Sequence, residues 1–253
     1  MSLRVRILQI DVPAAQLDEA TTFWAAALDA TPVRSAGGFV HLHDARSVVE
    51  VHLQPLDAGP ARYHLDLEVF ADRDGTGAHG ARDRRDAEVD ETCDLGARAG
   101  PASGEGYTVV HDPAGLPLCV IDADAAPRNP LAPRRDARPH LGAIFLDVPA
   151  DLVDAEVAFW LAALGATPGP IVDDYLAIAG VMGPGGPLDL EVQRIDGPPR
   201  LHVDVTADDV AGEAARLEGL GAVRVAEIGD WVVLADPTGN LLCVVPPQDG
   251  VTE

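Results

Sequence analysis

The sequence predicts an α+β fold in which four βαβββ units follow one another, two in each of two tandem copies of one domain. Three observations predict it: an internal repeat over most of the chain, strand and helix patterns that recur in the same order, and a proline-rich stretch between the copies. The mixed sheet of each copy is expected to curl into a cup. The expected boundaries are 1–122 for the first domain, 123–139 for the linker and 140–247 for the second domain.

The repeat is visible in short phrases that return in the same order. Both copies have an opening Asp-Val-Pro, a Phe-Trp pair, an Arg-x-His-x-Asp phrase and a closing Asp-Pro-x-Gly-(x)3-Cys-Val. The first copy also carries a polar insert at Asp72–Arg85, which we expect to be an exposed, mobile loop. The shared phrases occupy residues 11–13, 23–24, 62–66 and 112–120 in the first copy and 147–149, 159–160, 200–204 and 236–244 in the second.

Hydrophobic periodicity predicts the same elements in each copy: a strand, a helix, two short strands, a further strand, a second helix and a closing hairpin. Each second helix ends at Leu-Gly-Ala, where Gly96 or Gly221 suits a left-handed cap. The expected strands are Ile7–Val12, Phe39–Leu42, Val48–Gln54, Tyr63–Phe70, Tyr107–His111 and Leu118–Asp122, then Ala143–Val148, Tyr175–Ala179, Leu188–Gln193, Leu201–Thr206, Trp231–Ala235 and Leu241–Val245, with weaker strands at Ala97–Ala99 and Arg224–Ala226. The expected helices are Leu17–Leu28, Ala87–Leu95, Val153–Leu164 and Val210–Leu220.

The net charge of the chain limits the classes of partner that it can bind. The 41 acidic residues outnumber the 18 basic ones and give a formal net charge of −23. Such a field repels phosphate backbones and anionic membrane surfaces, so we expect neither nucleic acid nor a membrane as a partner. The chain contains no lysine, which excludes Schiff-base chemistry and a P-loop lysine. A small molecule is the expected partner.

The cysteines and the start of the chain indicate a compartment. Three cysteines without a CxxC pair are too few for a disulfide framework. The chain opens directly into a strand-like run with no signal peptide, and no apolar stretch is long enough to span a membrane. A cytoplasmic protein is expected, as a monomer or a homodimer.

Polar side chains gather on one face of the central strands, because strand side chains alternate between faces. For the histidines on these faces two interpretations stand: contact with a metal or substrate, or hydrogen bonds to neighbours at the floor of the cup. Cys119 and Cys243 lie in apolar strands, where a free cysteine usually packs as a small hydrophobic residue. The polar faces carry Glu50, His52, His64, Asp66 and Glu68 in the first copy and Glu191, His202, Asp204 and Thr206 in the second.

The repeated phrases resemble those of the vicinal oxygen chelate (VOC) superfamily, which includes glyoxalase I, extradiol dioxygenases and bleomycin-resistance proteins. The resemblance covers nearly all of both copies and omits only the linker and the insert. It implies two tandem glyoxalase-like domains. It is specific for the fold rather than the reaction, because the superfamily contains isomerases, oxygenases, lyases and non-catalytic binders.

The resemblance also implies four strand positions at which members hold a metal. The first position is aliphatic in both copies and cannot ligate, which leaves His-His-Cys in one copy and Glu-His-Cys in the other. These sets suit Zn²⁺ with an open position and lack the two-His-one-carboxylate set of iron oxygenases, so a dioxygenase is less expected. Zinc, nickel, manganese or iron is the expected metal. The four positions hold Ile7, His52, His64 and Cys119 in the first copy and Ala143, Glu191, His202 and Cys243 in the second, and the predicted ligands are His52, His64, Glu191 and His202.

Two functions remain open. In the first, the protein is a glyoxalase-like enzyme, a lyase or isomerase, in which a divalent metal polarises vicinal oxygens of the substrate. Glu50, Asp66 or Asp204 would then move a proton.

In the second, the protein is a metal-free binding protein without a cofactor that sequesters a cationic antibiotic or toxic compound. The acidic surface favours a cationic ligand. Tyr107, Tyr175 and Trp231 would supply the stacking surface.

Overall fold

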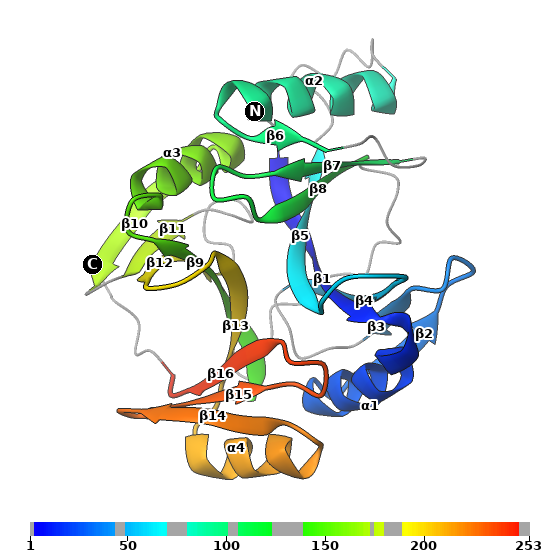
Figure 1. Ribbon diagram of the computed structural model, residues 1–253, viewed down its shortest axis with the longest axis vertical. Helices are drawn as coiled ribbons and strands as arrows, with labels where there is room; N and C mark the ends of the chain where they lie inside the picture. Colours follow the sequence, from blue (N-terminus) through cyan, green and yellow to red (C-terminus); the bar gives the residue numbers. More distant parts are fainter. Residues whose placement is uncertain are drawn as a thin grey trace. The chain divides into compact units, whose positions relative to one another are not determined.

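The computed structural model describes residues 3–43, 49–69, 80–100, 106–122, 139–172, 175–179 and 189–247. Within these residues the strands form two eight-stranded sheets, one from each copy, with helices packed against them (Figure 1). We call the copies the first repeat (1–122) and the second repeat (140–247). The first repeat contains β1 (Leu3–Pro13), a 3-10 turn η1 (Ala14–Gln16), α1 (Leu17–Ala27), β2 (Thr31–Arg34), β3 (Val40–His43), β4 (Glu50–Leu56), β5 (Arg62–Val69), α2 (Ala81–Asp94), β6 (Arg98–Ala99), β7 (Tyr107–His111) and β8 (Pro117–Ile121). The second repeat contains β9 (His140–Pro149), α3 (Val153–Leu164), β10 (Thr167–Val172), β11 (Tyr175–Ala179), β12 (Asp189–Ile195), β13 (Arg200–Thr206), α4 (Val210–Gly219), β14 (Val223–Ile228), β15 (Trp231–Ala235) and β16 (Leu241–Val245).

The two sheets have the same strand order. It is β2-β3-β4-β1-β5-β8-β7-β6 in the first and β10-β11-β12-β9-β13-β16-β15-β14 in the second. The strands that open the two βαβββ units of a repeat are therefore neighbours at the centre of each sheet. The closing strands β8 and β16 run parallel to β5 and β13, whereas the hairpin partners are antiparallel, so both sheets are mixed. This topology confirms the predicted α+β fold of four βαβββ units.

Packing divides the chain into two compact units, and each unit contains one half of each repeat. Unit 1 holds α2 with β6–β8 from the first repeat and α3 with β10–β12 from the second. Unit 2 holds α1 with β2–β4 and α4 with β14–β16. The domain boundaries predicted at the linker follow the duplication of the sequence and stay a prediction. The packing instead pairs one half of the first repeat with one half of the second. Unit 1 comprises Met1–Gln9, His64–Pro130 and Phe145–Leu201, and unit 2 comprises Ile10–Tyr63, Leu131–Ile144 and His202–Glu253.

In unit 2 the Phe-Trp pair of α1 connects the two repeats. The rings of Phe23 and Trp24 are fully buried and pack edge to face, with centroids 5.3 Å apart. The indole N–H of Trp24 donates a 2.8 Å hydrogen bond to Oδ2 of Asp236, which lies in the Asp-Pro-x-Gly turn of the second repeat. Arg216 of α4 donates to the backbone carbonyls of Ala26 and Ala27, at 3.1 and 3.0 Å, and so satisfies the last turn of α1.

In unit 1 the equivalent indole has a different partner. Trp160 of α3 donates at 2.8 Å to Oε1 of Glu156, one turn earlier in the same helix. Oε2 of Glu156 accepts the backbone N–H of Ala114 at 3.0 Å, from the Asp-Pro-x-Gly turn of the first repeat. Glu156 is fully buried and hydrogen bonds to the equally buried Asp112 of that turn. The residue that aligns with Glu156 in the first repeat is Ala20, so unit 2 has no carboxylate at this place.

Several local predictions can be compared with the structure. Gly96 and Gly221 adopt the left-handed conformation predicted for them, with φ of 105° and 113°. The strands β2 and β10 were not predicted, because the prolines within them weigh against strands except at sheet edges, where both lie.

The prediction of a mobile loop over Asp72–Arg85 is wrong at its end, because α2 begins at Ala81. The guanidinium of Arg85 is buried and donates to Asp122 at 2.9 Å, which connects the N-terminal part of α2 to the residue after β8. The start of the predicted loop, up to residue 79, lies outside the described residues.

Candidate metal centre

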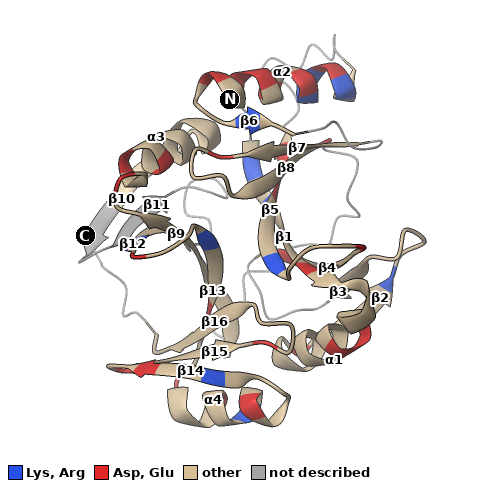
Figure 2. Cartoon of the chain, in the orientation of Figure 1, with Lys and Arg blue, Asp and Glu red and all other residues tan. Residues whose placement is uncertain are grey.

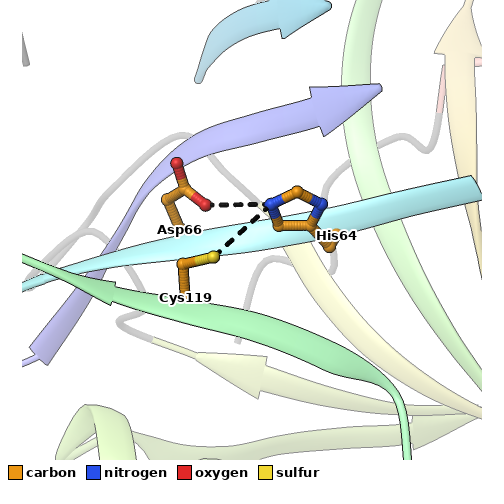
Figure 3. A group of neighbouring side chains, drawn as sticks. All are labelled: His64, Asp66 and Cys119. Carbon is orange, nitrogen blue, oxygen red and sulfur yellow. Dashed lines mark hydrogen bonds and ion pairs between the residues drawn. The ribbon is translucent and has the colours of Figure 1, made fainter. Parts of the chain in front are cut away.

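Two neighbouring parallel strands of unit 1 bring three polar side chains together. Asp66 on β5 lies opposite Cys119 on β8 in the strand register. His64 precedes Asp66 by two residues and therefore points to the same face of β5. Figure 3 shows the three side chains turned toward one another, two from one strand and one from its neighbour. One donor atom from each of them lies within 4.8 Å of the other two.

The three donor atoms converge on a single point. Nε2 of His64 lies 3.2 Å from Oδ1 of Asp66 and 3.7 Å from Sγ of Cys119 (Figure 3). In a relay of the Cys-His-Asp kind, the thiol and the carboxylate would contact opposite nitrogens of the ring. Here both contact the same nitrogen, which offers one proton or one lone pair but not both. The geometry therefore suits three ligands of one cation better than a nucleophile with its base.

The three side chains of this group are almost completely shielded from solvent. His64 and Asp66 are each 5 % exposed, and Cys119 is 9 % exposed. The side chains of Ile7 and Ile121 pack against Cys119 and form a small apolar cluster with it. Burial raises the pKa of the Cys119 thiol, an effect that the neighbouring imidazole of His64 opposes and the charge of Asp66 reinforces. A metal that binds here must therefore displace the thiol proton.

The carboxylate of Asp66 also interacts with a residue outside the donor group. The amide nitrogen of Gln9, on β1, donates a 3.0 Å hydrogen bond to Oδ2 of Asp66. Oδ1 is thereby directed toward His64. One step further along the same face of β5, the guanidinium of Arg4 forms an ion pair with the buried carboxylate of Glu68.

The second repeat places an equivalent group in unit 2. Asp204 on β13 lies opposite Cys243 on β16, and His202 precedes Asp204 by two residues. Nε2 of His202 lies 3.6 Å from Oδ1 of Asp204, and all three residues are buried. These two groups are the sets of three potential ligands within the described ranges.

The predicted ligands divide between these groups and other places. His64 and His202 belong to them, whereas His52 and Glu191 do not. His52 is buried on β4, with Nε2 3.7 Å from Oε2 of Glu50 and its ring 4.1 Å from that of His41. Glu191 lies half-buried on β12. A ligand role for His52 or Glu191 stays a prediction.

The other predicted site residues are placed as follows. Asp66 and Asp204, predicted as proton carriers, are themselves members of the donor groups. Glu50 is buried on β4. Tyr107 is exposed on β7 and Trp231 is half-buried on β15, while the side chain of Tyr175 lies outside the described residues. Their catalytic and stacking roles stay predictions.

Gln9 was not predicted as a site residue. The signal that identifies it is the alternation of β1, because Gln9 lies two residues after Ile7, the first of the four positions that the resemblance implies. Both residues face the polar side of the sheet, where Ile7 contacts Cys119 and Gln9 bonds Asp66.

The donor chemistry fits a divalent metal. An imidazole nitrogen, a carboxylate oxygen and a thiolate are all zinc ligands, and three of them leave the fourth position of a tetrahedral site open for substrate or water. The thiolate is soft and favours zinc over manganese, which prefers oxygen and nitrogen.

The acidity of the chain is spread over its surface. Figure 2 shows acidic residues on each of α1 to α4 rather than on one element. No helix within the described residues is long and apolar enough to cross a membrane.

Comparison with known proteins agrees with this architecture. The profile of a family described as "Glyoxalase-like domain" matches residues 8–121 and again residues 143–245. No protein with a curated function matches the chain.

Similar solved structures include a Mn(II)-bound glyoxalase from Novosphingobium aromaticivorans, with 18 % identity, a TM-score of 0.61, and coverage of 99 % of this chain and 89 % of that one. An extradiol ring-cleaving dioxygenase from B. fuscum has 16 % identity, a TM-score of 0.63 and coverage of 98 % and 72 %. The 2,3-dioxygenase LapB from Pseudomonas sp. KL28 has 13 % identity, a TM-score of 0.58 and coverage of 96 % and 92 %. At these identities the likeness shows the fold.

Proposed function

Because this chain belongs to the family of proteins with a glyoxalase-like domain, we propose that it is a metal-assisted lyase or isomerase acting on a small molecule. The observation that carries the proposal is the convergence of His64, Asp66 and Cys119 on one buried point, repeated by an equivalent group in the second repeat. The Mn(II)-bound glyoxalase among the structures of similar fold supports a divalent metal.

A bound divalent metal would supply Lewis-acid polarisation of vicinal oxygens on the substrate. The residues of the chain would orient and protect that chemistry. His64, Asp66 and Cys119 would fix the metal on one side and leave the other side for the substrate. Their low exposure excludes bulk water, which strengthens electrostatic interactions at the centre.

Proton transfer needs a group that is not a ligand. Asp66 loses this role if it binds the metal. Glu50 then remains as a predicted acid or base, buried on β4 in unit 2 with Oε2 3.7 Å from Nε2 of His52. We keep His52 and Glu191 as proposed additional ligands, to be tested by the same titration.

A reducing compartment such as the cytoplasm is part of the proposal. All three cysteines are free, and the ligand role of Cys119 requires a reduced thiol. A monomer or a homodimer remains the expected assembly.

The test is the metal content of the purified, untagged protein, followed by titration of the metal-free protein with Zn²⁺, Ni²⁺, Mn²⁺ and Fe²⁺. We expect tight binding of at least one metal per chain, with His64→Ala weakening it. His111→Ala is the matched control, because His111 on β7 belongs to neither donor group. Failure of all four ions to bind would retire the metal mechanism.

One observation favours the alternative of a metal-free binding protein. Ile7 occupies the first ligand position and packs against Cys119, as a hydrophobic core would. In this case the net charge of −23 would attract a cationic ligand. Calorimetric titration of the metal-free protein with bleomycin should then show binding without turnover, and absence of heat would count against this alternative.

A further inference from the structure

We propose that Gln9 makes the donor group of the first repeat the tighter metal site of the two, by positioning the carboxylate of Asp66. This inference rests on the proposed function, because it assumes that these groups bind a metal. Gln9 is a positioning residue, since it touches Asp66 and not the metal. Three observations carry the proposal: the direction of its hydrogen bond, its unused carbonyl oxygen, and the residue that replaces it in the second repeat.

Gln9 is the donor in its hydrogen bond with Asp66. The NH₂ group of Gln9 faces Oδ2 of Asp66, and that carboxylate oxygen accepts. With Oδ2 held at 3.0 Å, the carboxylate cannot rotate freely, and Oδ1 stays 3.2 Å from Nε2 of His64. A ligand held in place before the metal arrives loses less conformational entropy on binding.

The carbonyl oxygen of the Gln9 amide indicates that Gln9 is not an ordinary core residue. Gln9 is 5 % exposed, and its Oε1 has no hydrogen-bond partner among the described residues. Burying a polar atom without a partner is unfavourable. Water or a ligand hydroxyl at the centre would satisfy this oxygen, which favours a functional reason for an amide at position 9.

The second repeat has no side-chain amide at the position of Gln9. The phrase ILQIDVP at 7–13 aligns with AIFLDVP at 143–149, so Phe145 stands where Gln9 stands. A phenyl ring has no N–H to donate to a carboxylate. The distance from Nε2 to Oδ1 is also longer in the second group, at 3.6 Å between His202 and Asp204. The two groups therefore offer the same ligand types, but only the first repeat has a side-chain amide at this position of its opening strand.

The size of the effect follows from known outer-sphere contributions. Hydrogen bonds to metal-ligating groups contribute about 10- to 100-fold to metal affinity. We expect the metal-free, full-length protein to bind a first Zn²⁺ about 10- to 100-fold more tightly than a second. Competition with a chromophoric chelator measures both steps, and Co²⁺ reports bonding to a thiolate by its charge-transfer absorption.

Two variants test the inference. Gln9→Met keeps a side chain of similar length but removes the donor, and should weaken the tight site about 10- to 100-fold without changing the weak one. Gln16→Met is the control, since Gln16 is half-buried on η1 and outside both groups.

The outcomes separate this inference from the proposed function. Two sites of equal affinity in the wild type, or unchanged affinity in Gln9→Met, would overturn the inference while leaving a metal-binding protein. No binding of Zn²⁺ or Co²⁺ to the wild type would overturn both.

Discussion

Asp112 of the first repeat and Glu156 of the second form a buried carboxyl pair that is held by one proton. Both side chains are fully buried in unit 1. The two oxygens of Glu156 accept hydrogen bonds from the indole N–H of Trp160 and the backbone N–H of Ala114. The pKa of Asp112 is raised to about 9, first by burial and then by the hydrogen bond and charge of Glu156, against the lowering effect of backbone N–H groups.

This pair makes the stability of the chain depend on pH. The unfolded chain releases the Asp112 proton near its ordinary pKa of 3.8, whereas the folded chain keeps it to about 9. Between these values the folded state binds more protons, so the contribution is full below 3.8 and is lost as the pH rises through about 9. Asp112→Asn removes this titration while keeping shape and a donor toward Glu156. We expect the variant to unfold at higher urea than the wild type near pH 8, and the gain to shrink near pH 5.

The control for this prediction is Asp236→Asn. Asp236 occupies the equivalent turn but accepts hydrogen bonds from Trp24 and Thr238 rather than meeting a second carboxylate. The substitution should therefore destabilise the protein at both pH values. A stability gain that is the same at both pH values in Asp112→Asn would contradict the shared proton.

The indole N–H of Trp24 should stabilise the folded protein in addition to the burial of the ring. Trp24→Phe leaves Oδ2 of Asp236 buried without its donor, at a cost of about 2 kcal/mol in the free energy of unfolding. Trp231→Phe should cost much less, because Trp231 is only half-buried on β15. Chemical unfolding followed by circular dichroism measures both, and equal losses would argue against a specific role of the Trp24 hydrogen bond.

Arg216 should stabilise α1 across the repeat boundary. Arg216→Met keeps the aliphatic stem but removes two hydrogen bonds to the carbonyls of Ala26 and Ala27 and the ion pair with Glu213. Because the side chain is 39 % exposed, we expect a modest loss of about 1 kcal/mol. Hydrogen exchange should show faster opening at the end of α1. Arg224→Met, on the exposed ion pair with Glu218, should leave that exchange unchanged.

Thiolate ligation can be tested residue by residue. Cys119→Ser should abolish the Co²⁺–thiolate absorption of the tight site, and Cys243→Ser that of the weak site, because an alkoxide is not formed at neutral pH. Cys93→Ser is the control, since Cys93 on α2 belongs to neither group. Retention of the band in the double variant of Cys119 and Cys243 would show that the thiols are core residues.

The sequence alone reveals the duplication and the order of the elements, because repeated phrases and hydrophobic periodicity are local signals. It also places His64 and Asp66 on one strand face by simple alternation. Alternation alone could not predict that His52 and Glu191 lie outside the donor groups. Which side chains meet depends on the register between strands.

The partners of the buried polar groups were less accessible to sequence reasoning. The apolar pattern of α1 shows that Trp24 is buried but not that it meets Asp236, which lies 212 residues later. Likewise, a glutamate in an amphipathic helix reads as a surface residue. Only the structure shows that Glu156 turns inward to Asp112, because the match depends on two repeats packing together.

The pairing of halves from different repeats has a consequence for biosynthesis. Unit 1 needs residues only as far as Leu201, whereas unit 2 also needs the segment from His202 onward. At about 5–20 residues per second, the 212 residues between Trp24 and Asp236 take on the order of 10–40 s to emerge. During that time α1 can pack only against its own repeat, as Trp24 does against Tyr63, and the indole N–H of Trp24 lacks the acceptor that it has in the folded chain.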